Sequence, residues 1–326
     1  MRILIVGAGD VGRTYGHHLQ RGGASIAFLV KEKYRQSAQR GWTLRWMRPA
    51  QAALTDRFEA QGILTSMDAV ARESWDQVWL AMSSDALDPS WLDPLLLAVR
   101  DAPIIGLQPG MDDDEMLQSR ICSDRLVQGL IGIVAWESPL PGEQGTPEGL
   151  AYWFPPLSAS LFCGPRPLVD NIVRTLKKGG CPARRVDDVA QVRARASGAL
   201  MPLITALEAS NWSFSQLAHS DQLATGLRGA QEALAIVAAH RAEGRPIWRC
   251  LLKGFLVRLL LPIARRLAPM DLERYLRHHF TKVGSQTRQM MRSYIDVGTR
   301  HALPTNTLDS LLASSEAGDR CGHQPV

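Results

Sequence analysis

Three glycines near the N-terminus have the spacing that a dinucleotide-binding loop requires. The segment Gly7-Ala8-Gly9-Asp10-Val11-Gly12 follows the apolar run Arg2–Val6 and matches the pattern G-x-G-x-x-G. In such loops the first glycine permits a tight turn, the second lets the backbone approach a pyrophosphate, and the third allows close helix packing. A helix is predicted from there to Arg21, and a second strand over Ser25–Val30. This strand–helix–strand unit favours dinucleotide binding over a glycine loop that holds no ligand.

The residues after the second predicted strand bear on which nicotinamide cofactor binds. NAD sites offer a carboxylate to the ribose 2′-hydroxyl at this place, whereas this chain continues as Lys31-Glu32-Lys33. Positive charge suits a 2′-phosphate, and Lys31 is the expected contact. NADP(H) is therefore predicted, with NAD(H) as the alternative that Glu32 keeps open. Because Asp10 repels a phosphate, its carboxylate is expected to point away from the cofactor.

The N-terminal half alternates predicted strands and helices. Further strands are predicted over Gln77–Met82, Pro103–Leu107 and Leu130–Ala135, a half-exposed strand over Trp42–Met47, and helices over 67–72 and 93–100. This alternation is typical of an α/β, Rossmann-type doubly wound sheet. Ligands of such sheets lie beyond the carboxyl ends of the strands, so the loops after Met82 and Leu107 should border the cofactor.

The C-terminal half has the pattern of an all-helical domain. Its helices are predicted over Ala190–Leu207, Gln222–His240, Ile247–Leu267 and Leu272–Arg300. We expect an NADP-binding Rossmann domain over 1–185, a helical substrate and dimerisation domain over 186–314, and a disordered tail over 315–326. The active site is then expected in the cleft between the two domains.

Three segments resemble the ketopantoate reductase family, over nearly the whole chain. Ile3–Gly16 is similar to that family's opening Gly-Ala-Gly-x-x-Gly-x-x-Tyr-Gly pattern, Leu107-Gln108-Pro109-Gly110 to its Leu-Gln-Asn-Gly loop, and Leu303–Leu308 to its closing Pro-x-Asn-x-x-Leu segment. The resemblance implies a Rossmann domain followed by a helical domain, and an NADP(H)-dependent reductase. It also implies that Gln108 and Pro109 lie beside the cofactor.

The chain departs from this family where the family's catalytic residues stand. The asparagine of the Leu-Gln-Asn-Gly loop is Pro109 here, and no lysine lies between Lys33 and Lys177. Aligned on the proline of the second domain's first helix, the family's catalytic lysine and two asparagines correspond to Arg193, Ser197 and Met201. The family's acidic residue in the late helix falls near Gly284 or Ser285 here. These departures favour a divergent member of the family that acts on a substrate other than ketopantoate.

Arg193 is the first candidate for the chemistry itself. Hydride transfer to a carbonyl requires a group that polarises or protonates the developing alkoxide, and usually a cation for the substrate carboxylate. A guanidinium is a poor proton donor, but it can stabilise an oxyanion or bind a carboxylate through two parallel hydrogen bonds. The alternative for Arg193 is a surface arginine near a helix start.

A polar flank on the last long predicted helix supplies the other candidates. At about 100° per residue, His279, Lys282 and Gln286 lie together beside the apolar stripe. Lys282 is the predicted proton donor, with His279 as a second catalytic candidate, and Gln286, Ser197 and Asn211 are predicted to bind substrate. A solvated helix flank is the alternative. No His, Asp or Glu grouping has metal-ligand spacing, so no metal is expected.

Composition limits the partners. The 37 lysines and arginines and 32 acidic residues give a charge of +5 that is spread along the chain, which favours a small anionic substrate weakly and does not indicate nucleic acid.

Five scattered cysteines without a C-x-x-C pair favour a reducing, cytoplasmic location. No apolar run reaches the roughly 18 residues of a membrane span. The apolar segment 247–267 favours a buried or dimer-forming helix, hence a homodimer, over a membrane-surface helix.

Together these features predict a cytoplasmic NADP(H)-dependent oxidoreductase. It would reduce a small 2-oxo acid, or a related oxo or imino compound, by hydride transfer. The competing hypothesis is a catalytically inactive NADP(H)-binding protein that serves as a sensor or a partner subunit.

Overall fold

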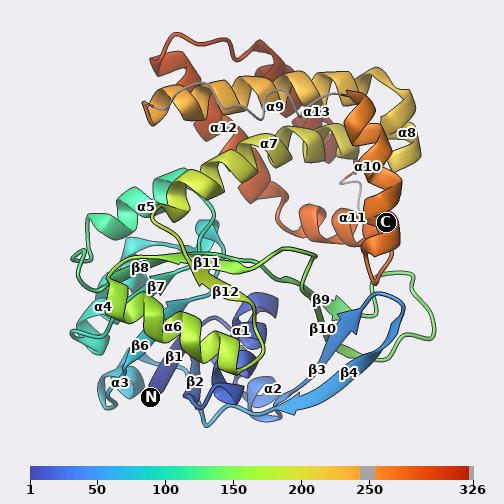
Figure 1. Cartoon of the computed structure of the whole chain (residues 1–326). Coiled ribbons are helices and arrows are strands. Elements are labelled where there is room, and N and C mark those ends of the chain that lie inside the picture. Colours follow the sequence, from blue (N-terminus) through green and yellow to red (C-terminus); the bar gives the residue numbers. More distant parts are fainter. Residues whose placement is uncertain (243–253, 323–326) are drawn as a thin grey trace. The chain divides into compact units, whose positions relative to one another are not determined.

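Two compact units, Met1–Ala190 and Gln191–Val326, make up the chain (Figure 1). The computed structural model describes residues 1–242 and 254–322. The division at Ala190 lies close to the domain boundary predicted at residue 185.

An eight-stranded sheet of order β12-β11-β8-β7-β6-β1-β2-β5 forms the centre of the first unit. Neighbouring strands run parallel except β8 and β11, which are antiparallel. The strands are β1 (Arg2–Val6), β2 (Ser25–Leu29), β5 (Gly62–Leu64), β6 (Gln77–Leu80), β7 (Ile104–Gly106), β8 (Leu126–Leu130), β11 (Ser160–Cys163) and β12 (Ala183–Arg185).

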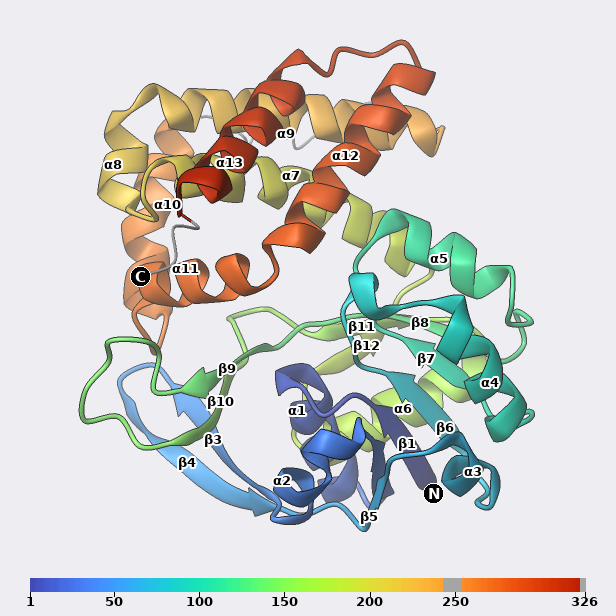
Figure 2. The ribbon, with the colours of Figure 1, turned by 180° about the vertical axis from the view of Figure 1, so that it is seen from behind.

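Helices cover both faces of this sheet, as Figures 1 and 2 show from opposite sides. One hydrophobic core packs α1 and α6 on the sheet, and a second core packs α3, α4 and α5 on the other face. The helices are α1 (Asp10–Arg21), α2 (Arg35–Gln39), α3 (Met67–Ala71), α4 (Pro89–Val99), α5 (Met111–Gln118) and α6 (Arg166–Lys178), with short 3-10 turns η1 (Glu32–Tyr34) and η2 (Ser84–Ala86). The predicted doubly wound α/β sheet is therefore confirmed.

A second, four-stranded sheet was not predicted, apart from one of its strands. Its order is β4-β3-β10-β9, with strands β3 (Trp42–Arg48), β4 (Gln51–Phe58), β9 (Val134–Ser138) and β10 (Gly149–Trp153). The strand predicted over Leu130–Ala135 is wrong, because β8 ends at Leu130 and β9 begins at Val134 in the other sheet. Between them the chain passes so close to its neighbours that a Cβ on Gly132 would lie 2.3 Å from the carbonyl carbon of Ala159.

Every described element of the second unit is a helix. These are α7 (Val189–Ala209), α8 (Phe214–His219), α9 (Asp221–His240), α10 (Gly254–Leu267), α11 (Leu272–Lys282), α12 (Gly284–Arg300) and α13 (Asn306–Gly322). The first part of the helix predicted over 247–267 lies outside the described residues. Within residues 1–242 and 254–322, none of the helices combines the length and the apolar composition that crossing a bilayer requires.

The helix predicted over Leu272–Arg300 is two helices, so this prediction is wrong. Val283, with φ −110° and ψ 23°, ends α11 and precedes α12, and the two helices leave this turn in different directions (Figure 2). Each of the two helices has its own buried residues, among them Tyr275 on α11 and Met290 and Tyr294 on α12. A helix face that is laid out at a constant angle per residue along α11 therefore does not continue on α12.

The closing Leu303–Leu308 segment starts a helix that a partly buried carboxylate caps. Glu232 of α9 accepts hydrogen bonds from the Thr307 amide at 3.0 Å, the Thr307 hydroxyl at 2.6 Å and the Leu308 amide at 3.1 Å. The helix continues to Gly322, so the disordered tail predicted from residue 315 is wrong over 315–322, and 323–326 lie outside the described residues. The Ser315 hydroxyl, which donates to Glu208 at 2.8 Å, helps to hold this helix.

Substituting Glu232→Ala is expected to destabilise the helical unit by about 2 kcal/mol, because several donors at the start of α13 lose one acceptor. Thermal unfolding followed by circular dichroism measures the change. Gln231→Ala, on the same helix, is the control and should unfold close to the wild type. Equal unfolding temperatures for both variants would contradict this role of Glu232.

Candidate functional site

The glycine loop has the shape of a phosphate cradle. Gly7 adopts φ +97°, and a Cβ there would lie 3.1 Å from the Ala81 carbonyl oxygen. A Cβ on Gly12 would lie 2.3 Å from the Gly7 carbonyl oxygen, whereas one on Gly9 would meet no atom within 4 Å. Two glycines are therefore needed for internal packing, and Gly9 leaves open space at the N-terminus of α1. This space fits a dinucleotide pyrophosphate, which backbone amides and the helix dipole would hold.

The Asp10 carboxylate in this loop is neutralised by Arg13, one helical turn further on. Arg13 Nη2 donates to Asp10 Oδ1 at 2.8 Å, and the same nitrogen forms an ion pair with Glu137 of β9. The Asp10 carboxylate thus has a partner, Arg13, which the sequence analysis missed. That Asp10 points away from a bound phosphate stays a prediction. The spacing of Asp10 and Arg13 at i and i+3 on a helix is the signal that could have revealed this pair.

Removing the Arg13 charge is expected to weaken NADPH binding about tenfold, since two carboxylates near the phosphate cradle lose their cation. Arg13→Met is the test variant, and NADPH fluorescence titration measures the dissociation constant. Asp10→Asn in the Arg13→Met background should recover most of the affinity. If the double variant binds no better than Arg13→Met, the electrostatic role of Arg13 is refuted.

Gln108 joins two strand ends. Its Nε2 donates to the carbonyl oxygens of Leu80 and Met82, each at 3.0 Å, and its Oε1 accepts from the Leu107 amide at 3.1 Å. The side chain is 1% exposed. The role of Gln108 shown by these contacts is therefore to hold the loops after β6 and β7 together, while direct cofactor contact stays a prediction. Pro109 follows it and is partly exposed.

A buried carboxylate that sequence reasoning missed orders the second of these loops. Asp113 Oδ2 accepts from the Gly110 amide at 2.7 Å and from the Ser84 hydroxyl at 2.6 Å. Asp113 thereby ties the start of α5 to the 3-10 turn that follows β6. The two loops predicted to border the cofactor are thus held at the same edge of the sheet as the glycine loop, where Ala81 also approaches Gly7.

Lys31 lies exposed directly after β2 and Val30, at the start of the turn that leads to α2. Beside it, the Glu32 carboxylate accepts from Arg35 Nη1 at 3.2 Å. A hydrogen bond with Thr65, and then the charge of Arg35, lower the pKa of Glu32, so this group remains a carboxylate. The end of β2 therefore carries a cation available to a phosphate and an acid that already has an arginine partner.

In the helical unit the structure brings together Arg193, Ser197 and Tyr294. Arg193 is 4% exposed, so it is not the surface arginine of the alternative reading. The Ser197 hydroxyl donates to the Arg193 carbonyl at 2.9 Å and lies 2.5 Å from the Tyr294 hydroxyl of α12. Burial raises the pKa of Tyr294 to about 12, while the hydrogen bond with Ser197 and the charge of Arg193 oppose this rise. Tyr294 thus belongs to this cluster, and sequence reasoning did not assign it to the site.

The remaining predicted residues do not form one flank. His279 and Lys282 end α11, and His279 stacks on Tyr275 with ring centroids 5.5 Å apart. Gln286 is in the first turn of α12, beyond the break at Val283. Asn211 follows α7, roughly 25 Å of helix from Arg193 at 1.5 Å per residue, and its Nδ2 donates to Gln216 at 3.2 Å. A small substrate could not contact Arg193 and Asn211 together.

Comparisons with known proteins show what this chain is similar to. The ketopantoate reductase PanE/ApbA family profile matches residues 3–143. No curated protein sequence matches the chain. Among solved structures, a D-mandelate dehydrogenase with NADH and anilino(oxo)acetate aligns with a TM-score of 0.72 at 12% identity, covering 97% of each chain.

Two solved ketopantoate reductases align equally well. The 2-dehydropantoate 2-reductase of Geobacter metallireducens gives a TM-score of 0.71 at 17% identity, covering 98% of this chain and 100% of that one. The PanE/ApbA family ketopantoate reductase of Ralstonia eutropha gives 0.71 at 16% identity, covering 99% and 100%. Residues 3–143 therefore match the ketopantoate reductase family model, and the chain has a ketopantoate reductase-like fold.

Proposed function

We propose that the chain is a cytoplasmic NADP(H)-dependent oxidoreductase that reduces a small 2-oxo acid, or a related oxo or imino compound. The observation that carries this proposal is the open space over Gly9 at the N-terminus of α1, in a loop whose other glycines are fixed by packing. The solved D-mandelate dehydrogenase, whose structure contains NADH and anilino(oxo)acetate, supports the cofactor and substrate classes.

Each candidate residue then has a stated role. The amides at the start of α1 hold the pyrophosphate, and Lys31 binds the 2′-phosphate. When bound, the nicotinamide supplies a hydride to the substrate carbonyl. Arg193 holds the substrate carboxylate, because its guanidinium presents paired donors at a fixed spacing. Lys282 supplies the proton, with His279 as the second candidate.

Lys31→Ala is expected to weaken NADPH binding about tenfold while leaving NADH binding unchanged, because only NADPH carries the 2′-phosphate. Fluorescence titration with both cofactors measures this selectivity. Lys33→Ala is the matched control, since the Lys33 ammonium lies 4.9 Å from the Tyr34 ring centroid. Equal losses for NADPH and NADH in Lys31→Ala would argue against a 2′-phosphate contact.

A specific observation favours the second candidate, a cofactor-binding protein without catalysis. Two positions that correspond to the asparagines beside the family's catalytic lysine are engaged in helix packing: Ser197 bonds within its helix and to Tyr294, and Met201 is buried. Mixing the protein with NADPH and a panel of 2-oxo acids, and following absorbance of the reduced nicotinamide, separates the two. Turnover with any panel member excludes the inactive protein, and loss of that turnover in Arg193→Met supports the role of Arg193.

A further inference from the structure

The strand order of the large sheet divides the cofactor site into two halves. From β1 the chain continues to β2 and β5 on one side, and then to β6, β7 and β8 on the other side of β1. A dinucleotide lies across the point where the strand order reverses, with one mononucleotide half over each side. The proposed contact with Lys31 places the adenosine half over β2. The nicotinamide half then lies over the loops that follow β6 and β7.

Two buried side chains fix the loop after β6. Gln108 Nε2 donates to the Met82 carbonyl at 3.0 Å, and Asp113 Oδ2 accepts from the Ser84 hydroxyl at 2.6 Å. Gln108 is 1% exposed and Asp113 is 7% exposed. Ser83 stands between the two fixed residues and is exposed. Ser83 is therefore the part of this loop that a ligand can contact.

The same carboxylate fixes the loop after β7. Asp113 is the third residue of α5, and its Oδ2 accepts from the Gly110 amide at 2.7 Å, so the helix caps its own N-terminus. A Cβ on Gly110 would lie 2.5 Å from this oxygen, because the carboxylate packs directly against the glycine. Leu117 packs α5 onto the sheet, on the face seen in Figure 2. One oxygen of a residue on a packed helix thus holds both loops.

We propose that Asp113 is a positioning residue for the nicotinamide half of the cofactor, an inference that rests on the proposed function. Without its carboxylate, Ser84 and Gly110 lose a shared acceptor, and the tie between the two loops is broken. A nicotinamide ring displaced by about 1 Å no longer meets its substrate in a reactive geometry. The pyrophosphate and adenosine halves bind over α1 and β2, so they do not depend on this tie.

The experiment compares NADPH with 2′-phospho-ADP-ribose, the same molecule without its nicotinamide, by calorimetric titration of the full-length chain. Ser84→Ala removes the bond to the loop after β6 and leaves the Gly110 cap of α5 in place. The NADPH dissociation constant is expected to rise about fivefold in Ser84→Ala and about tenfold in Asp113→Ala. The constant for 2′-phospho-ADP-ribose should stay within about twofold of the wild type in both variants. If NADH is the tighter ligand, ADP-ribose serves as its fragment.

Asp113→Asn and Glu115→Ala are the controls. Asparagine keeps an acceptor for the Gly110 amide, and its own amide can donate to the Ser84 hydroxyl oxygen. Glu115→Ala removes an exposed carboxylate two residues further along α5. Both variants should bind NADPH within about twofold of the wild type.

Four outcomes would overturn the inference. Unchanged NADPH affinity in Ser84→Ala would show that Asp113 only caps α5. Equal losses for NADPH and its fragment would show a change in the whole N-terminal unit. A loss in Asp113→Asn as large as in Asp113→Ala would assign the effect to charge instead of hydrogen bonding. These three outcomes leave the proposed function standing, whereas a wild type that binds neither cofactor nor fragment refutes both.

Discussion

Gly9→Ala is expected to weaken NADPH binding by a factor of ten or more, while the thermal unfolding of the chain stays unchanged. Gly9 has φ −72°, which alanine adopts freely, and a Cβ there meets no protein atom within 4 Å. The added methyl group therefore leaves the fold intact and occupies the space through which a pyrophosphate approaches the α1 amides. Fluorescence titration with NADPH, beside a melting curve, measures both effects.

Gly12→Ala is the contrasting variant, because its methyl group would lie 2.3 Å from the Gly7 carbonyl oxygen and 3.2 Å from the Ala81 Cβ. The first of these atoms is backbone and cannot rotate away. Overpacking of this kind destabilises by about 3 kcal/mol, so both stability and cofactor affinity should fall. Wild-type NADPH affinity in Gly9→Ala would show that no pyrophosphate binds over Gly9.

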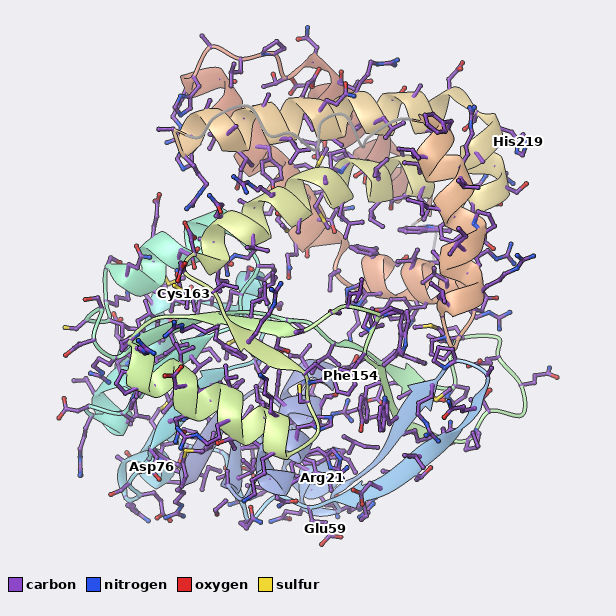
Figure 3. The ribbon with its side chains drawn as sticks, viewed as in Figure 1. Arg21, Glu59, Asp76, Phe154, Cys163 and His219 are labelled. Atoms are coloured by element: carbon purple, nitrogen blue, oxygen red, sulfur yellow. The ribbon has the colours of Figure 1, made fainter. Side chains whose placement is uncertain are left out.

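Two buried histidines on α1 are expected to make the chain less stable as the pH falls from 6.5 toward 4. His17 and His18 are each 2% exposed, and burial lowers the pKa of each to about 4. They lie among Tyr152, Phe58 and the Phe154 side chain labelled in Figure 3. His18 Nδ1 lies 2.9 Å from the Gly179 carbonyl, so this nitrogen carries the hydrogen.

Whether acid lowers or raises the stability depends on which state, folded or unfolded, binds more protons. Between pH 6.5 and pH 4 the unfolded chain protonates both rings and the folded chain does not, so protons stabilise the unfolded state. Above pH 6.5 both rings are neutral in the folded and the unfolded chain, so the free energy of unfolding is at its full value. It falls by about 3 kcal/mol per histidine by pH 4. Chemical denaturation at several pH values measures this loss.

His17→Phe separates this effect from other titrating groups. Phenylalanine keeps the aromatic packing, and the His17 Nε2 is buried without a hydrogen bond, so little is lost at neutral pH. The variant should lose about half of the histidine contribution between pH 6.5 and pH 4. A pH profile identical to that of the wild type would mean that His17 is protonated in the folded chain.

Local patterns predicted the N-terminal unit well where strands are buried on both faces. The glycine loop, β1, β2, β6 and β7 are short-range features, since turn-forming residues and continuous apolar runs can be recognised from neighbouring residues. The second sheet escaped notice because β3 pairs with β10, which lies about 100 residues further along the chain. Pairing over such a separation depends on which surfaces the fold brings together.

The candidate site likewise has parts that short-range patterns predict and parts that depend on tertiary contacts. By itself the sequence determined the glycine loop between β1 and α1 and the place of Lys31 at the end of β2, because each depends on spacing within one or two elements, while the burial of Arg193 came from the tertiary structure. Only the tertiary structure decided that Glu137 joins the Arg13–Asp10 pair, that Tyr294 joins Ser197, and that the predicted helix breaks at Val283 into α11 and α12. The first two arrangements join residues about 100 or more positions apart in the chain, and burial decides which polar group finds a partner.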